Sequence, residues 1–288
     1  MDTAKARVLT YNVLGYSMDE CQSDLDERKA EITLHCEDAG IDVALLQEIK
    51  TVYAKGDQVW HECERPWRMS KIYGDNSYFI YADQRGPSKN GEGIASRWQL
   101  RQVDFGPLPM GLFGRAYVMA TIELQGLPLR LLTFHLEPPA IGRMITQYRA
   151  TTSSQDAVRR TQLQYLARLI ESRNDDVPLV VGGDFNIDGM TPELQAWARN
   201  LGLRAVFADG AGHGSSRKTF ATHRSPSFDC GREMRLDHLF VRGSRSFDMT
   251  VETEGMFLAS PVAAENRYFY GYLSDHVGLF ADLKITAR

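Results

Sequence analysis

The sequence contains few cysteines and no long apolar run, and each shortage excludes a class of protein. Its four cysteines, in 288 residues, show neither the dense spacing of a disulfide framework nor the CxxC pairs of a zinc site, which suits free thiols in a reducing compartment. No stretch approaches the roughly 20 apolar residues that cross a bilayer, and the first residues show no signal-peptide pattern. We therefore expect a cytoplasmic protein without a transmembrane segment.

Linkers are also lacking, because no segment is of low complexity or rich in proline, glycine and serine. Residues 1–288 are therefore expected to form a single domain. Hydrophobic residues make up 43% of the chain and charged residues 24%, which is ordinary for a globular protein with a large core. The net charge of −4 argues against nonspecific coating of nucleic acid. The locally basic segments 141–160 and 213–235 could steer an anionic substrate or be only solvated surface.

Apolar and β-branched runs predict most of the secondary structure. Strands are expected at 7–13, 42–48, 78–83, 93–98, 116–124, 129–137, 178–186, 235–242 and 276–285. Helices are expected at 26–40, after a cap at Ser153 or Asp156, and after Thr191 and Pro192. Helices in both strand-rich halves predict two packed sheets with helices outside.

One short stretch, VVGGDFNID at 180–188, ends a hydrophobic run with an acid and an amide. If the strand continues, Asp184 and Asn186 point to the same face. Gly182 and Gly183 would let a neighbouring backbone or a ligand approach closely. The alternative is a strand that runs into a turn, since Asp and Asn are common turn residues.

Polar residues recur near the ends of the other predicted strands. They are Asn12, Glu48, His135, Glu137, Asp237 and the run Ser274, Asp275 and His276. Each alone is more often a cap or turn residue, but together they predict convergence on one rim of the sandwich, where loops leave room for a ligand. Carboxylates and amides with few imidazoles favour a hard cation such as Mg²⁺ over zinc. Phosphate ester hydrolysis needs such a cation, a positioned water and donors to the phosphate oxygens.

These residues lie in motifs that resemble those of a known superfamily. The motifs, in chain order, are TYN, LQE, FHLE, GGDFN, RLDHLFV and SDH. Between residues 10 and 285 the chain resembles the endonuclease/exonuclease/phosphatase superfamily, and it looks similar to the tyrosyl-DNA phosphodiesterase 2 branch and to uncharacterised bacterial relatives. The resemblance implies the DNase-like α/β fold, a four-layer α/β/β/α sandwich of two mainly antiparallel sheets flanked by helices. It also implies a phosphodiesterase that depends on Mg²⁺, or on Mn²⁺ in its place.

The same resemblance implies a role for each motif residue. Glu48 is the expected principal metal ligand, with Asn12 nearby and Asp275 in support. Asp184 is expected to orient or deprotonate the attacking water, and Asn186 to hold a phosphate oxygen.

The expected proton donors are two histidines. His276, oriented by Asp237, would donate to the phosphoryl group as charge builds, because a carboxylate beside an imidazole favours its protonated form. His135 is expected to be a second donor. His238 follows Asp237 and so points to the opposite face, where a core or surface position is the simpler interpretation.

The remaining candidate residues are expected to support the site or to contact the substrate. Arg159 and Gln162 are interpreted as structural buttresses, and Arg115 as a weak candidate for a phosphate contact. Arg267 and Tyr270 are expected to bind substrate. The expected substrate loops are 51–78, 137–154, 207–232 and 255–273. Their aromatic side chains could stack on unpaired bases, enter a lipid interface or only pack the loop.

The substrate expected from these features is a nucleic-acid end or a single strand. Two alternatives stay open. One is the headgroup of a phospholipid or phosphoinositide, as in sphingomyelinase-like enzymes, and the other is a binding module that has kept the fold without turnover. No protein partner can be inferred from the sequence.

Overall fold

The computed structural model describes most of the chain, in segments separated by gaps. The described residues are 2–14, 25–50, 78–82, 90–109, 111–139, 151–173, 175–207, 218–221, 233–262 and 271–288. Among them, no helix is both long and apolar enough to cross a membrane.

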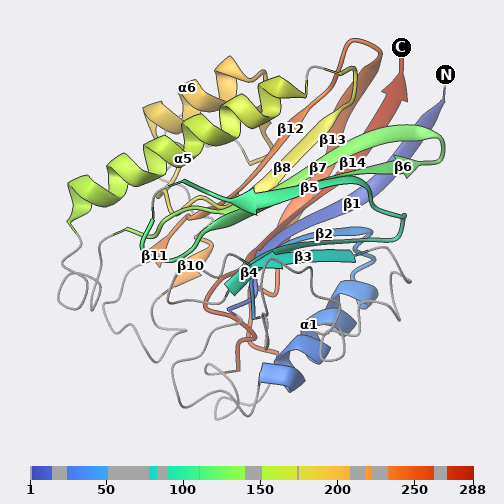
Figure 1. The fold of residues 1–288 in the computed structure, drawn as a ribbon. Coiled ribbons are helices and arrows are strands. Elements are labelled where there is room, and N and C mark those ends of the chain that lie inside the picture. The colour runs from blue at the N-terminus through green and yellow to red at the C-terminus, as the bar shows by residue number, and fades with distance from the viewer. Residues whose placement is uncertain are drawn as a thin grey trace, which may run out of the picture.

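Two six-stranded sheets form the centre of the molecule (Figure 1). The first sheet has the order β13 (Phe247–Phe257), β14 (Gly278–Ala287), β1 (Thr3–Asn12), β2 (Val43–Lys50), β4 (Asn90–Ser96) and β3 (Tyr78–Ala82). The second sheet has the order β5 (Arg101–Pro107), β6 (Ala116–Leu124), β7 (Leu127–His135), β8 (Leu179–Asp184), β12 (Asp237–Arg242) and β9 (Arg204–Ala205). A separate short ribbon pairs β10 (Phe220–Ala221) with β11 (Glu233–Met234).

Each sheet contains one parallel strand pair, and the other strand pairs are antiparallel. The parallel pairs are β1 with β2 and β7 with β8. Parallel neighbours need a long crossover, which is usually helical. Here α1 (Leu25–Asp38) lies between β1 and β2, and α5 (Thr152–Ser172) lies between β7 and β8. The expected helix at 26–40 is therefore part of a crossover.

The pairing brings several polar strand ends to one edge of the sandwich. In the first sheet, Asn12 at the end of β1 pairs with Gln47 of β2. In the second sheet, His135 at the end of β7 pairs with Asp184 at the end of β8. Because β12 runs antiparallel to β8, its first residue, Asp237, also pairs with Asp184. Topology alone therefore gathers side chains that lie far apart in the sequence.

Helices cover the outer face of each sheet (Figure 1). α5 and α6 (Pro192–Asn200) pack on the second sheet, where Leu166 and Trp197 join its hydrophobic cluster. α1 packs on the first sheet through Ile32 and Cys36. A further cluster with residues from both sheets fills the space between them. The four-layer α/β/β/α sandwich with mainly antiparallel sheets confirms the predicted fold.

The two helices after residue 150 differ in how well their starts were predicted. α6 is capped as expected by Thr191, whose side chain accepts a hydrogen bond from the Leu194 backbone. α5 is capped by Thr151 rather than by Ser153 or Asp156. A reciprocal capping box between Thr151 and Ser154 satisfies two backbone N–H groups there, which favours the earlier start.

Besides the two-residue strands β9, β10 and β11, two longer strands were not expected, β5 and β13, and both lie at the edge of a sheet. β5 has mostly exposed or half-buried side chains, so it carries little apolar signal. β13 contains an irregularity between Val251 and Thr253, which interrupts the alternation that identifies a strand. Edge strands need less burial than central strands, and these two therefore have weak sequence patterns.

The glycine pair in β8 allows close packing of the protein's own strands. A Cβ added to Gly183 would lie 2.3 Å from the Phe134 carbonyl oxygen of β7. A Cβ added to Gly182 would lie 2.8 Å from Leu45 Cδ1 in the opposite sheet. Of the two interpretations for these glycines, approach of a neighbouring backbone is therefore correct for Gly183, and contact with the facing sheet explains Gly182.

Candidate active site

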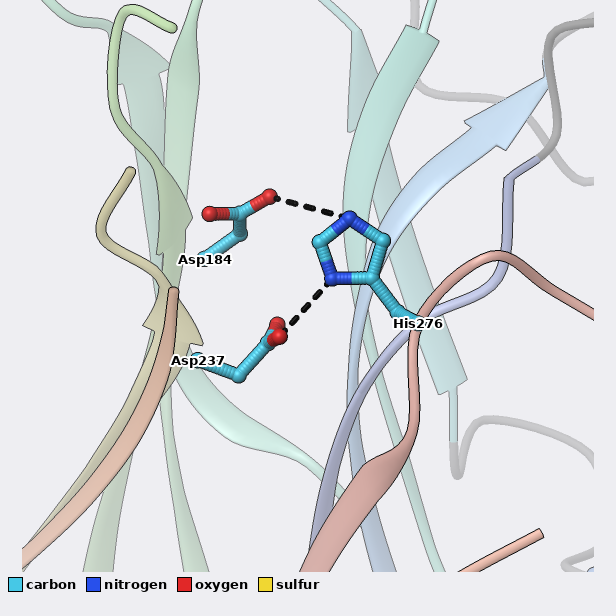
Figure 2. Close-up of side chains that lie close together, drawn as sticks. All are labelled: Asp184, Asp237 and His276. Carbon is cyan, nitrogen blue, oxygen red and sulfur yellow. Dashed lines mark hydrogen bonds and ion pairs between the residues drawn. The ribbon is translucent and has the colours of Figure 1, made fainter. Parts of the chain in front are cut away.

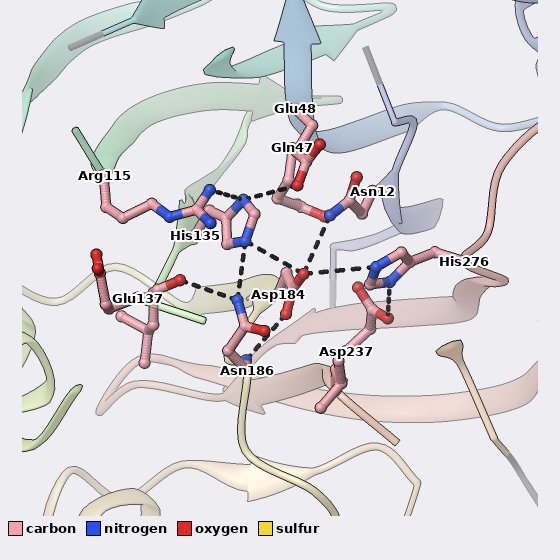
Figure 3. A network of polar contacts seen from close by, with 12 residues as sticks. Asn12, Gln47, Glu48, Arg115, His135, Glu137, Asp184, Asn186, Asp237 and His276 are labelled. Carbon is pink, nitrogen blue, oxygen red and sulfur yellow. Dashed lines mark hydrogen bonds and ion pairs between the residues drawn. The ribbon is translucent and has the colours of Figure 1, made fainter. Parts of the chain in front are cut away.

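Asp184, the last residue of β8, lies at the centre of the polar edge. It is 2% exposed, and its Oδ2 accepts a hydrogen bond of 3.0 Å from Asn12 Nδ2. The same oxygen lies 3.3 Å from His135 Nε2 and 3.7 Å from His276 Nε2 (Figure 3). One carboxylate oxygen is therefore shared by side chains from three different parts of the chain.

Asn186 lies beside Asp184, but strand alternation does not bring it there. β8 ends at Asp184, and Asn186 has a left-handed backbone with φ of 52°. Its backbone N–H donates to Asp184 Oδ1 at 2.9 Å, which is the turn geometry that Asp and Asn favour. The prediction of a continued strand was therefore wrong, whereas the turn interpretation is correct and still places both side chains together.

Glu48 reaches the site through a bulge in β2. The register of β2 against β4 shifts between Leu46 and Ile49, and Glu48 has a left-handed backbone with φ of 57°. A non-glycine residue in that region costs roughly 1–2 kcal/mol. Such bulges redirect side chains next to functional sites. β2 continues to Lys50 rather than ending at Glu48, whose Oε1 lies 3.8 Å from His135 Nδ1.

His276 and Asp237 form the acidic side of the site (Figure 2). His276 Nδ1 lies 2.8 Å from Asp237 Oδ2, and Thr219 Oγ1 accepts a hydrogen bond from the Asp237 backbone. The His276 Nε2 atom lies 3.7 Å from Asp184 Oδ2 and 4.0 Å from Asp275 Oδ1. A single imidazole is thus surrounded by three carboxylates.

The carboxylates determine the charge of His276. Burial by itself lowers the pKa of His276, but Asp237, Asp184 and Asp275 together raise that pKa to about 10. Burial and the neighbouring Asp237 raise the pKa of Asp184 to about 7. Near neutral pH His276 is therefore protonated on both nitrogens, while Asp184 lies close to its own titration point.

Asp275 has the properties of a cation ligand. It is 3% exposed, and its Oδ1 has no hydrogen-bond partner among the described residues. Burial raises its pKa to about 6, and the charge of Glu48 contributes to the rise. Glu48 and Asp275 are thus close enough to interact electrostatically. A buried carboxylate oxygen without a donor is costly unless a cation or a proton neutralises it.

A second group could also hold a metal ion. Ligand atoms of Asp184, Asp237 and His276 lie within 4.8 Å of one another, and all three residues are buried. This group shares Asp184 with the polar network but contains neither Glu48 nor Asp275.

Arg28 supports the site and was not singled out from the sequence. Arg28 is 1% exposed, and its guanidinium donates to the Leu273 carbonyl at 2.7 Å and to the Leu14 carbonyl at 3.0 Å. It thereby ties the chain after Asn12 to the chain before Asp275. The available signal was its position in α1, because this charged residue lies on the same helical stripe as the buried apolar residues.

His135 has a different environment from His276. Arg115 Nη1 lies 2.8 Å from His135 Nδ1, and Asn186 Nδ2 lies 2.9 Å from His135 Nε2 (Figure 3). Burial, the Arg115 charge and the His276 charge hold the pKa of His135 well below its usual value. His135 is therefore neutral. Arg115 was considered only for a phosphate contact, and its position beside the imidazole was not foreseen.

The end of β7 is held by the side chains that were interpreted as buttresses. Gln162 Oε1 accepts a hydrogen bond of 2.9 Å from the Glu137 backbone N–H, and Arg159 donates to the Glu137 carbonyl at 3.1 Å. The Glu137 carboxylate in turn accepts from the Leu112 backbone at 2.8 Å. These contacts agree with the buttress interpretation of Arg159 and Gln162.

His238 lies on the opposite face from Asp237, as strand alternation requires. Its Nε2 lies 3.0 Å from the Ile187 carbonyl oxygen, and its ring is 5.2 Å from the Phe185 ring. His238 is thus a core histidine. Arg267 and Tyr270, together with most of the expected substrate loops, lie outside the described residues.

Comparisons with known proteins agree with this architecture. The sequence model of the Endonuclease/Exonuclease/phosphatase family matches residues 9–276. No curated protein shows significant sequence similarity to the chain.

Solved structures resemble the chain over nearly its whole length. D. rerio TDP2 complexed with a single strand DNA product is 18% identical, with a TM-score of 0.69, and the match covers 97% of this chain and 98% of that one. A beta toxin from Staphylococcus aureus is 17% identical, with a TM-score of 0.67 and coverage of 96% and 99%. A protein of the endonuclease/exonuclease/phosphatase family from Bacteroides thetaiotaomicron is 17% identical, with a TM-score of 0.66 and coverage of 99% of both chains. At these identities the likeness shows the fold.

Proposed function

Because this chain belongs to the Endonuclease/Exonuclease/phosphatase family, we propose that it is a metal-dependent phosphodiesterase that breaks a phosphate ester by attack of water. Members of this family are generally metal-dependent phosphoesterases or nucleases. The observation that carries the proposal is the convergence of Asn12, His135 and His276 on one buried oxygen of Asp184. A carboxylate near its titration point, beside a protonated imidazole, suits transfer of a proton from water and donation to a phosphate.

We infer that Glu48 and Asp275, with Asn12 beside them, would hold the metal ion. The buried Asp275 oxygen without a hydrogen-bond partner among the described residues fits a cation, and oxygen ligands suit Mg²⁺ or Mn²⁺. A bound divalent cation would offset the negative charge that develops on the phosphoryl oxygens. The alternative group of Asp184, Asp237 and His276 is less suitable, because a histidine protonated on both nitrogens has no lone pair for a metal.

Calorimetric titration with Mn²⁺ distinguishes the two metal groups. Asp275→Asn is expected to weaken Mn²⁺ binding tenfold or more, whereas Asp237→Asn is expected to leave the affinity nearly unchanged. The reverse result would assign the ion to the group that contains Asp237.

In the proposed reaction Asp184 accepts the proton of the attacking water. Its pKa of about 7 matches neutral pH, where the efficiency of a general base is high. The side chain of Asn12 and the backbone N–H of Asn186 hold the two carboxylate oxygens at 3.0 Å and 2.9 Å, respectively, so the carboxylate cannot rotate freely.

The two histidines and Asn186 act on the phosphoryl group. His276, held through Nδ1 by Asp237, donates from Nε2 as charge builds on a phosphoryl oxygen. The Asn186 amide and His135 bind a further phosphoryl oxygen. These donors lie on strand ends and on a tight turn of the scaffold, so they are positioned before substrate binds.

Hydrolysis of bis(p-nitrophenyl) phosphate tests whether the chain is an enzyme or a binding module. We expect turnover with Mg²⁺ or Mn²⁺, loss of turnover with a chelator, and loss in Asp184→Asn. Glu123→Gln is the matched control, because Glu123 is half exposed in β6 and pairs with Arg101 on the surface. Binding of single strands without turnover under any of these conditions would favour the module.

We further propose that the substrate is a nucleic-acid end or a single strand. The support is the similar fold of D. rerio TDP2 in complex with a single strand DNA product, and the basic segments at 141–160 and 213–235. A panel of single-stranded, duplex and 5′-tyrosyl DNA, RNA, sphingomyelin and phosphoinositides tests this choice. Turnover of a lipid with none of the nucleic acids would replace it, and binding that weakens steeply with salt would support it.

A further inference from the structure

We propose that Arg28 of α1 is a positioning residue that sets the place of Asp275 relative to the other metal-site residues, Asn12 and Glu48. This inference rests on the proposed function, because it concerns the metal ion inferred to bind there. Asn12 pairs with Gln47, the residue before Glu48, so the ladder between β1 and β2 already holds these two close together. Asp275 comes from a distant part of the chain and needs a tie of its own.

The pairing of β1 with β14 does not supply that tie. The ladder between these strands ends at the pair Thr10 with Leu279, and Asn12 and Asp275 both lie beyond its end. The distance between the two metal-site residues is therefore not determined by the hydrogen bonds of this ladder. Side chains that bridge the two chain segments must determine it instead.

Arg28 forms such a bridge. Its Nη1 donates at 2.7 Å to the carbonyl of Leu273, which lies just before the acidic end of the second segment. Its Nη2 donates at 3.0 Å to the carbonyl of Leu14, and Nη1 also lies 3.3 Å from the Val13 carbonyl oxygen, both in the first segment. A guanidinium is planar and presents its donors in a rigid fork. One side chain therefore holds the carbonyls of two segments at a defined spacing.

The bridge is buried and is anchored from behind. Arg28 is 1% exposed, and α1, which carries it, packs on the first sheet through Ile32 and Cys36. Hydrogen bonds from a charged donor are stronger than those between neutral groups, and loss of such a partner from a buried group is costly. The guanidinium therefore keeps the two segments in a fixed relation to the helix and to each other.

Ser274 ties the same two segments at a second point and carries no charge. Its hydroxyl donates to the Asn12 carbonyl at 2.8 Å and accepts from the His276 backbone N–H at 3.1 Å. Asp275 thus follows one bridging residue directly, and the Leu273 carbonyl before that residue is held by Arg28. The backbone on both sides of the Asp275 carboxylate is held in this way.

A metal site is sensitive to such positioning. Mg²⁺ requires nearly ideal octahedral geometry with short distances to its ligands, so a small displacement of one carboxylate lowers the affinity. The charge of Arg28 acts in the opposite direction, because a positive charge near a cation site repels the cation. Removing the charge alone would strengthen metal binding. A weaker affinity after loss of Arg28 would therefore report on position and not on charge.

Calorimetric titration of the full-length protein with Mn²⁺ at pH 8 tests the inference. Arg28→Met is expected to weaken Mn²⁺ binding about tenfold or more, because both segments lose their common donor. Arg28→Lys, which keeps the charge and a donor but not the fork, should give an intermediate affinity. Ser274→Ala, which changes no charge, should weaken binding severalfold.

Arg7→Met is the matched control. Arg7 also lies on β1, where it pairs with Asp282 of β14 and donates to the Ala39 carbonyl after α1 at 2.6 Å. It joins the same strands and the same helix, but roughly 17 Å along β1 from Asn12. Thermal unfolding in a chelator should show that this variant is destabilised as well, while its Mn²⁺ affinity stays within twofold of the wild type. A role in stability alone would affect both arginines in the same way.

Activity separates metal binding from the chemical step. Arg28 is too buried to contact substrate, so the kcat of Arg28→Met at saturating Mn²⁺ should lie within a few fold of the wild type. The Mn²⁺ concentration that gives half of the maximal rate should rise about tenfold. Hydrolysis of bis(p-nitrophenyl) phosphate over a range of Mn²⁺ concentrations measures both values.

Unchanged Mn²⁺ affinity in a folded Arg28→Met protein would overturn the inference. If that variant does not fold, Arg28→Lys and Ser274→Ala decide the question, and wild-type affinity in both would overturn it equally. These outcomes leave the proposed function intact, because the wild type still binds the ion. A wild type that binds no Mn²⁺ would instead reject the proposed function, and the inference with it.

Discussion

His276 and His135 both lie within 3.7 Å of the Asp184 carboxylate, and both are buried, yet their Nδ1 atoms contact groups of opposite charge. The Nδ1 of His276 contacts the Asp237 carboxylate, and the Nδ1 of His135 contacts the Arg115 guanidinium. The pKa of His276 is consequently raised to about 10, while the pKa of His135 is held well below its usual value by burial and by Arg115.

This difference shows that burial alone does not determine the state of a histidine. Burial lowers the pKa of both imidazoles, and only the three carboxylates near His276 reverse that effect. The site therefore has an acidic side, where Asp237 keeps the His276 imidazole protonated, and a donor side, where Arg115 contacts the neutral imidazole of His135. Asp184 lies between the two sides, and its removal should have the largest effect.

Asp184→Asn is expected to lower kcat by about 10²–10⁴-fold, because it removes the proposed proton acceptor that both histidines contact. Thermal stability should stay the same or rise, since burial and the neighbouring Asp237 disfavour the ionised form of Asp184. Steady-state kinetics with a chromogenic phosphodiester and thermal unfolding check the two parts. A folded variant that keeps more than a tenth of the wild-type kcat would show that Asp184 is not the base.

Asp237→Asn should lower the pKa of His276 and so reduce the difference between the two histidines. The raised pKa keeps His276 protonated in the wild type up to about pH 10. Without the Asp237 charge the proton is lost at lower pH, so the alkaline limit of activity should move down by at least about one pH unit. The acid limit, governed by deprotonation of Asp184 near pH 7, should also move down, but by less, because burial is the larger cause of the raised pKa of Asp184 and Asp237 the smaller one.

Profiles of kcat/KM against pH measure both limits, because they report the free enzyme. The control is Asp248→Asn, which removes an exposed carboxylate that pairs with Arg288 at the surface. An alkaline limit that is identical in the wild type and in Asp237→Asn would mean that His276 does not control it.

The sequence predicted which residues gather in this site better than it predicted how they are arranged there. Asp237 and His238 were assigned to opposite faces by alternation alone, and the structure agrees because β12 is a regular central strand. Alternation failed at Asn186, where a left-handed backbone follows the strand, and Glu48, expected at a strand end, lies instead in a bulge of β2. The bulge depends on the neighbouring strand, and no local pattern of residue types specified it, whereas the turn was one of two interpretations because Asp and Asn are common turn residues.

The partners of the two histidines were predictable to different degrees. Asp237 was recognised from its motif. The contact of Arg115 with His135 depends on the pairing of β6 with β7 and on the loop before β6, which a single sequence does not reveal. The edge strands β5 and β13 were missed because their own apolar patterns are weak, whereas the central strands, with their continuous apolar runs, were found.

Asp275→Asn tests whether the carboxylates on the acidic side, including Asp275, carry excess negative charge when no metal ion is bound. Burial and Glu48 raise the folded-state pKa of Asp275 to about 6, above its ordinary value of 3.8. The folded state therefore favours protonated Asp275. The contribution of this group to the free energy of unfolding is fully present below about pH 4 and is lost as the pH rises through 6. Removing the charge should stabilise the metal-free protein at pH 8 by about 3 kcal/mol, since the folded-state pKa lies about two pH units above the ordinary value and each unit corresponds to roughly 1.4 kcal/mol.

Thermal unfolding in a chelator, at about pH 4 and pH 8, checks the sign. The gain should be small at the lower pH and should amount to several degrees at the higher pH. Addition of Mn²⁺ should stabilise the wild type but not Asp275→Asn. A variant that is less stable than the wild type at pH 8 in chelator would contradict the proposed excess charge.

The smallest effect is expected on the donor side, from Gln162→Met. Gln162 accepts the hydrogen bond of the buried Glu137 backbone N–H, and loss of that acceptor costs about 1–3 kcal/mol. The end of β7, which carries His135, should then be held less firmly, so kcat should fall severalfold while the pH limits set by His276 and Asp184 stay in place. Gln164→Met is the matched control, because Gln164 lies on the same helix and is exposed. A change in the alkaline limit would show that the two sides are coupled through Asp184, whereas a fall in kcat alone would show that orientation and protonation are controlled separately.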